Sequence, residues 1–132
     1  ADPNALQVAV AAAQAVERIG MPEARIILSQ AALYVATAPK SNACYMAIDK
    51  ALDVVKNSKT APVPVHLQDA HYKGSAKLGH GVGYLYAHDY PNHYVRQQYL
   101  PDAYVNEKFY EPGDMGYERD IKKHLDKIKS EA

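Results

Sequence analysis

The histidines are the residues of this chain whose types could most readily support chemistry. Five of the six fall between residues 66 and 93, together with two aspartates: His66, His71, His80, His88, His93, Asp69 and Asp89. Imidazole and carboxylate groups bind transition metals, but none of these residues has the spacing of a HExxH, CxxC or facial-triad arrangement. The sequence therefore predicts no metal site, and it predicts histidines that hydrogen-bond loop carbonyls or lie at the surface.

A glycine-rich segment raises the question of phosphate binding. Gly79-His80-Gly81-Val82-Gly83 resembles part of a dinucleotide loop, but it lacks the final glycine spacing and a preceding buried strand. The chain also has no GxxxxGKS or GxxxxGKT motif. We therefore expect a flexible transition from helix to loop here, with no cofactor-binding residue in this chain.

Cys44 is the single cysteine and the only candidate thiol nucleophile. It falls early in an expected helix, and no base stands beside it in the sequence, so we expect a packed side chain and no catalytic residue. One cysteine excludes a disulfide framework and favours a reducing, cytoplasmic setting. No apolar run long enough to span a membrane occurs.

Tyrosine dominates the aromatic content. The chain has 11 Tyr, 1 Phe and no Trp, and nine of the tyrosines lie between residues 72 and 117. Three interpretations stay open: rings that pack the loop onto the helices, a protein interface, or base stacking supported by nearby cations. The candidate contacts to a partner or to DNA are Lys73, Lys77, Tyr84, Tyr86, Tyr90, Arg96 and Tyr99.

The charge balance argues against an autonomous nucleic-acid-binding domain. Fifteen basic residues balance 15 acidic ones, and residues 1–65 and 66–132 carry 6 against 5 and 9 against 10. Neither half has the basic excess of such a domain, although a local basic patch remains compatible with these numbers.

The elements that must position these side chains are predicted to be helices. Helix-start and helix-stop residues delimit three helices in residues 1–57: about 3–19, ended by Gly20, about 22–37, ended by Pro39, and about 41–56, capped by Ser41. The first is apolar on two adjoining stripes, so we expect it to be buried on most sides. The short connections predict antiparallel neighbours.

The remaining chain is predicted to be a long loop followed by a last helix. Residues 58–113 are rich in Pro, Gly and Tyr and have room for a short helix near residues 66–78. Around residue 90 either a small hairpin or an ordered loop fits; we favour a loop with at most two short strands. Asp114 is expected to cap a helix over 114–130 with an apolar seam of Tyr117, Ile121, Leu125 and Ile128.

Several of these segments carry a family resemblance that spans essentially the whole chain. The matching stretches are DPNAL, PEARIILSQAALYVATAPKSN, PVHL (64–67), YAHDYPNHYV (86–95), QQYLPD (97–102), YEP (110–112) and GYE (116–118). In these the chain resembles the C-terminal domain of the MgsA/RarA family of AAA+ ATPases, which are related to the Werner-helicase-interacting ATPase. The stretch around His71, Tyr72 and Gly74 departs from the family pattern in sequence but not in length.

The resemblance implies an all-α bundle of about five helices, similar to the clamp-loader collar that follows an AAA+ module. It implies a single helical domain over residues 1–132 that is catalytically inert and joins subunits into a homotetramer. The bacterial parent protein is then expected to bind ATP and Mg in its missing N-terminal part and to act in DNA replication, recombination and repair. Its implied partners are single-stranded-DNA-binding protein and forked or single-stranded DNA, in the cytoplasm and associated with the nucleoid. The alternative is an accessory module that binds single-stranded DNA or a partner protein through the tyrosine-rich loop.

Overall fold

The structure is a computed structural model and describes residues 1–59 and 61–131. The chain divides into two units, one made of residues 1–43 with 112–123 and the other of residues 44–111 with those from 124 onward. Four long helices and one helical turn are present in the described residues, which contain no β-strand. The predicted all-α class with about five helices is confirmed.

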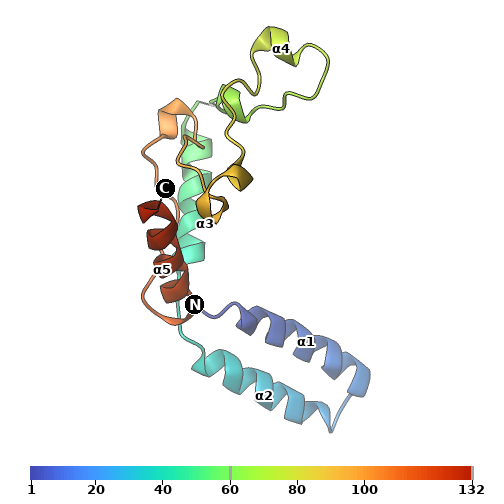
Figure 1. The fold of residues 1–132 in the computed structure, drawn as a ribbon. Coiled ribbons are helices and arrows are strands. Elements are labelled where there is room, and N and C mark those ends of the chain that lie inside the picture. The colour runs from blue at the N-terminus through green and yellow to red at the C-terminus, as the bar shows by residue number, and fades with distance from the viewer. Residues whose placement is uncertain (60, 132) are drawn as a thin grey trace. The chain divides into compact units, whose positions relative to one another are not determined.

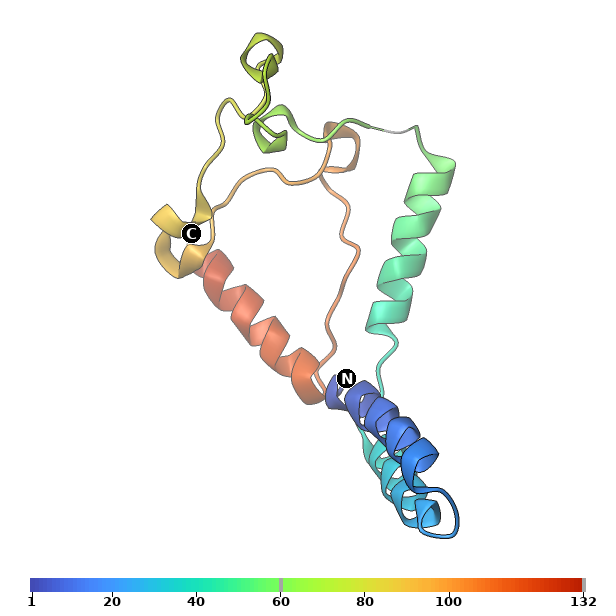
Figure 2. The ribbon, with the colours of Figure 1, turned by 90° about the vertical axis from the view of Figure 1, so that its right-hand side faces the viewer.

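The first unit is built on a helical hairpin. Helix α1 (Asn4–Ile19) and helix α2 (Ala24–Thr37) run antiparallel, side by side, as Figures 1 and 2 both show. Gly20 ends α1 with φ at 75°, a backbone conformation that glycine adopts without steric cost. The predicted boundaries and the antiparallel arrangement of these two helices are therefore confirmed.

Asp2 joins the start of α1 to the end of α2. Its Oδ1 accepts the Asn4 backbone N–H at 2.9 Å, and its Oδ2 accepts the Tyr34 hydroxyl at 2.8 Å. The hydrogen bond from Tyr34, followed by that from Asn4, holds the pKa of the Asp2 carboxyl below its ordinary value. The carboxylate thus satisfies one of the backbone N–H groups at the start of α1.

The helix seam is narrow, and this corrects the expectation that α1 is buried on most sides. Ala24 is fully buried and Ala12 is 9% exposed, because small side chains let the two backbones approach. The large apolar residues of α1 face solvent instead, with Leu6 73% exposed and Val10 and Ile19 about half exposed. One neighbouring helix can cover only one stripe of a helix that has two.

Two further long helices carry the rest of the regular structure. Helix α3 (Ala43–Asn57) begins where Ser41 Oγ accepts the Ala43 N–H at 3.1 Å, as predicted. In helix α5 (Gly116–Ser130), Ile121, Leu125 and Ile128 are half-buried on one side. Lysines lie in its last turn, where their positive charge interacts favourably with the negative end of the helix dipole.

The start of α5 differs from the prediction. The Asp114 carboxylate accepts a hydrogen bond from Lys122 Nζ at 2.6 Å, whereas the carboxylate that receives a backbone N–H near the helix start is that of Glu118. A glutamate in the first turn can reach back to a free amide as effectively as a residue that precedes the helix.

The segment between α3 and α5 is an ordered loop. It holds the single turn α4 (Ser75–Leu78) and four short 3₁₀ turns: η1 (Val65–Leu67), η2 (Ala87–Asp89), η3 (Pro91–His93) and η4 (Asp102–Tyr104). The favoured loop is therefore found around residue 90, and the hairpin is not. Side chains hold this loop in place: Tyr104 Oη donates to Lys59 O, just beyond the end of α3, at 2.7 Å, and Arg96 Nη2 donates to Lys129 O of α5 at 2.9 Å.

Candidate interaction sites

The α1–α2 hairpin presents a shallow cavity between its helices. This hairpin groove has a volume of about 320 Å³ and is lined by Val8, Ala11, Ala12, Ala15, Ile27, Gln30 and Ala31. Its floor is made of methyl groups, and its single polar side chain is an amide. A surface of this kind can pack against another apolar helix, but it offers no charged group to bind a small polar ligand.

Helix α2 is apolar around most of its circumference. Ile26 is 63% exposed and Leu33 64%, and these two residues share one face because they are seven positions apart. Leu28 is 50% exposed and points away from that face. A helix that is hydrophobic on all sides is normally buried on all sides. The hairpin groove and the outer faces of α1 and α2 are therefore candidate surfaces for contact with another protein.

Glu118 organises the polar centre of the same unit. The side chain is 6% exposed, and its carboxylate accepts the Ser41 hydroxyl at 2.6 Å and the Gly113 N–H at 2.8 Å. These two hydrogen bonds hold the pKa of the Glu118 carboxyl below its ordinary value. The carboxylate therefore stays ionised and joins the connection before α3 to the start of α5.

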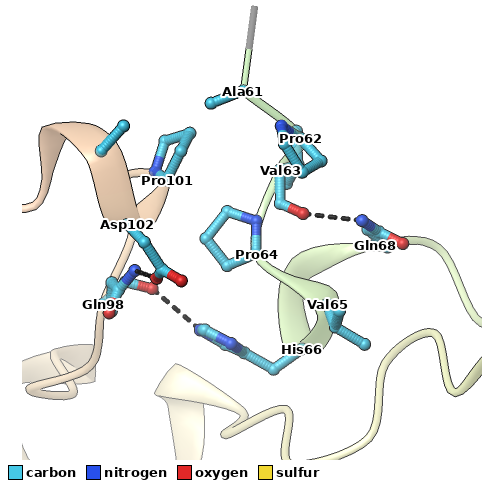
Figure 3. A pocket seen from close by; sticks show the side chains of 11 residues that line it. Ala61, Pro62, Val63, Pro64, Val65, His66, Gln68, Gln98, Pro101 and Asp102 are labelled. Atoms are coloured by element: carbon cyan, nitrogen blue, oxygen red, sulfur yellow. Dashed lines mark hydrogen bonds between the residues drawn. The ribbon is translucent and has the colours of Figure 1, made fainter.

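In the second unit, a pocket opens between two extended stretches of the loop (Figure 3). This proline pocket has a volume of about 460 Å³, with Pro62, Pro64 and Pro101 in its walls. His66 Nε2 lies 2.8 Å from the Gln98 carbonyl oxygen, and the Gln98 amide donates to Asp102 Oδ1 at 2.7 Å. Its polar groups thus bond mainly to one another, which indicates a structural role.

A second pocket lies nearby on the loop and is larger. This tyrosine pocket has a volume of about 690 Å³ and is lined by His66, Leu67, Gln68, Asp69, Ala70, His71, Gly81, Tyr84 and Tyr86. Asp69 Oδ1 accepts a hydrogen bond from the backbone N–H of His71 at 2.9 Å. The same oxygen lies 2.8 Å from the ring Nδ1 of His71. These two hydrogen bonds hold the pKa of the exposed Asp69 carboxyl below its ordinary value, and the backbone bond has the larger effect.

The sequence-predicted contact residues do not gather at one site. Tyr84 and Tyr86 both line the tyrosine pocket, and Lys73 and Lys77 flank or lie on α4 without an ion pair in the described residues. Arg96 is engaged by the Lys129 carbonyl. The Tyr99 hydroxyl, for its part, donates to Val95 O at 3.1 Å. Tyr90, 37% exposed, lies beyond η2 and lines neither pocket.

The histidines are distributed as single groups or pairs. His66 faces the Gln98 carbonyl, His71 faces Asp69, and His80 Nδ1 lies 2.7 Å from the Tyr72 hydroxyl. The rings of His88 and His93 lie 4.8 Å apart. In residues 1–59 and 61–131, no three His, Cys, Asp or Glu side chains converge as metal ligands would.

Two other sequence predictions are settled by local geometry. Gly79, Gly81 and Gly83 have positive φ values and follow the short α4, so this stretch is the expected helix-to-loop transition. Cys44 is exposed near the start of α3, which corrects the prediction of a packed thiol. Its exposure follows from the solvent-facing position of this part of α3, where Tyr45 and Met46 are exposed as well.

Comparison with known proteins places the chain in a family. The family described as "MgsA AAA+ ATPase C terminal" matches residues 1–129. The chain belongs to this family. The resemblance seen in the sequence motifs is thereby confirmed.

Relatives of the family are similar over almost the whole chain. An AAA domain-containing protein of Mycobacterium tuberculosis is 50% identical over 98% of this chain, and Replication-associated recombination protein A of Bacillus subtilis is 45% identical over 97%. The ATPase WRNIP1 of Dictyostelium discoideum is 40% identical over 84%. The chain spans 29%, 31% and 13% of the lengths of these three proteins, respectively.

Some residues of these sites could not be recognised from the sequence alone. Glu118 lies within the GYE motif of the MgsA C-terminal family, yet only the fold shows that it pairs with Ser41, 77 positions away. For Asp69 and His71 the residue types suggest only metal ligation, and the sequence gives no sign that they line the tyrosine pocket.

Among the described residues, no helix is both long enough and apolar enough to cross a bilayer.

Proposed function

We propose that this chain is the oligomerisation domain of an AAA+ ATPase and that it joins four subunits into a homotetramer. The observation that carries the proposal is the exposed apolar surface of the α1–α2 hairpin. Leu6, Ile26 and Leu33 are each more than 60% exposed, and they lie on faces that the hairpin itself does not cover.

The solvent-accessible surface area of the chain supports the proposal that a partner covers part of it. The chain exposes 10214 Å². A compact protein of its mass exposes about 6,900 Å², and two separate folded halves expose about 8,300 Å² together. A surplus of about 1,900 Å² therefore remains even against the larger reference, and an obligate interface needs about 1,000 Å² or more from each partner.

The mechanism proposed for the domain is geometric. Closed packing of four hairpins fixes the spacing of the AAA+ modules attached to them, so that an arginine of one subunit can complete the ATP site of its neighbour. ATP and Mg would be bound by the parent protein outside this chain, which supplies no catalytic residue. The parent is proposed to act as a DNA-dependent ATPase in replication, recombination and repair at stalled forks, in contact with single-stranded DNA and its binding protein.

Charge substitution on the hairpin tests the proposal. Ile26→Glu with Leu33→Glu places two carboxylates on exposed positions of α2, so the isolated hairpin keeps its own seam. In the assembly these carboxylates would be buried without partners, which costs about 3 kcal/mol or more and weakens association at least about 100-fold. Sedimentation velocity measures the change.

A matched variant separates an interface effect from a general charge effect. Val82→Glu makes the same kind of substitution at a 71% exposed residue outside the hairpin and should leave the assembly unchanged. Equal association by the α2 double variant and the unmodified chain would refute the hairpin as the interface.

A further inference from the structure

The tyrosine pocket has walls that the backbone holds in place. The Gly81 N–H donates to the Val65 carbonyl at 2.9 Å and returns the chain to η1, while the buried Ser75 donates through Oγ to the Ala70 carbonyl at 2.8 Å. A Cβ at Gly81 would lie 2.7 Å from the Ala70 Cβ, so the chain segments around Ala70 and Gly81 are in close contact. The pocket is thus formed before any ligand arrives, and its volume falls in the range of about 300–1,000 Å³ of small-molecule sites.

Two aromatic rings of the pocket have faces available to a ligand. Tyr84 and Tyr86 are each 54% exposed, and neither hydroxyl has a hydrogen-bond partner in the described part of the chain. The Tyr86 ring contacts His88, with ring centroids 5.0 Å apart, and this neighbour limits its freedom. Exposed rings that are partly immobilised can stack on a planar ligand at a low entropic cost.

The charges around the pocket attract anions. Between residues 66 and 86 the acidic residue is Asp69, which pairs with His71, while Lys73 and Lys77 have no acidic partner in the described residues. Residues 66–86 therefore carry one more basic than acidic side chain, although the whole of residues 58–113 is balanced, with five of each. Lys73 follows His71 of the pocket wall by two positions and Lys77 lies on α4, so the phosphates of a strand that runs from the pocket towards α4 would meet these two ammonium groups.

We infer that the tyrosine pocket binds an unstacked base of single-stranded nucleic acid, stacked on Tyr84 and Tyr86, with flanking phosphates held by Lys73 and Lys77. The polar atoms at the pocket, those of Asp69 and His71, meet the edge of the base. Stacking accepts any base, so the site is largely indifferent to sequence but requires a strand whose bases are not paired. Arg96 takes no part, because the Lys129 carbonyl holds it.

Anisotropy of a fluorescent single-stranded oligonucleotide, titrated with the 132-residue chain, tests this inference. Tyr84→Ala with Tyr86→Ala should weaken binding about 5- to 100-fold at every salt concentration, because stacking does not depend on counterions. Lys73→Ala with Lys77→Ala should instead reduce the slope of log K against log salt by about 0.7 for each lysine. A duplex of the same sequence should bind more weakly than the single strand.

Two control variants keep the result interpretable. Tyr84→Phe with Tyr86→Phe retains both rings and should bind like the unmodified chain, and Tyr45→Ala removes an exposed ring of α3, outside the pocket, and should also bind normally. Absence of oligonucleotide binding at low salt, or equal binding by the Ala double variant, would overturn the inference and leave the pocket to a protein partner. Sedimentation of the same variants should be unchanged, which separates this inference from subunit assembly.

Discussion

The Glu118 carboxylate is the buried acidic group among the described residues of the first unit. It is buried, it accepts one hydroxyl and one backbone N–H, and its pKa is lowered by these two hydrogen bonds. Removing a buried acceptor leaves its donors unsatisfied, which costs about 1–3 kcal/mol. We therefore regard Glu118 as the residue that fixes α5 to the connection before α3.

Replacement of Glu118 gives a prediction with a defined pH dependence. Glu118→Ala should lower the free energy of unfolding by about 1–3 kcal/mol at neutral pH, measured by urea denaturation, and Glu118→Gln should lose less because it retains one acceptor. Because the folded-state pKa lies below the ordinary value of 4.5, the stabilisation is complete above that pH. It is lost as the pH falls from there through the folded-state pKa.

The Gln variant should lack this part of the acid sensitivity, and Glu17→Gln, at an exposed position of α1, serves as the matched control. If Glu118→Gln and the unmodified chain lose stability in parallel over this pH range, the carboxylate does not have the assigned role.

For single residues, the sequence identifies which side chains could bind a partner, but it does not show which other residues of the chain already hold them. Contact of Tyr84, Tyr86 and Arg96 with a partner or DNA stays a prediction. The two tyrosine rings are exposed, whereas the Arg96 guanidinium donates to a backbone carbonyl. The difference arises because Arg96 meets a residue 33 positions away, and such a long-range contact leaves no mark on the local pattern.

At the element scale, the α1–α2 hairpin is held by small residues and leaves its large residues outside. Ala12 and Ala24 occupy the seam, while Leu6, Ile26 and Leu33 face away from it. A lone hairpin of this kind buries little apolar area, so its helices should open readily unless another surface covers them.

Amide hydrogen exchange provides a test at this scale. In our account, the amides of α1 and α2 gain protection as the chain concentration rises from micromolar towards millimolar, because association covers the hairpin. The amides of the loop around α4 should exchange at the same rate throughout and serve as the internal reference. Protection of α1 and α2 that does not depend on concentration would contradict the account.

Element boundaries were predictable where a single residue determines them. Gly20 and Ser41 act through local backbone and capping geometry, and both end or begin a helix where expected. The start of α5 was not predictable in the same way, because Asp114 and Glu118 are both acceptors near one helix end. Glu118 is also held by Ser41, far away in the sequence, and the local pattern gives no sign of that partner.

At the scale of the whole molecule, the apolar surface and the family membership point to the same conclusion. The chain is about 30% of the length of its bacterial relatives from Mycobacterium tuberculosis and Bacillus subtilis and leaves large apolar side chains exposed. Sequence motifs could predict the family and the helical class. They could not predict how little of each helix the chain would cover by itself, because exposure depends on which helices become neighbours.

Sedimentation equilibrium of the unmodified chain, over a range of micromolar concentrations, measures the central claim most directly. The account predicts a species with four times the 14.6 kDa mass of one chain, in equilibrium with smaller species at the lowest concentrations. A mass of 14.6 kDa at every concentration would contradict it.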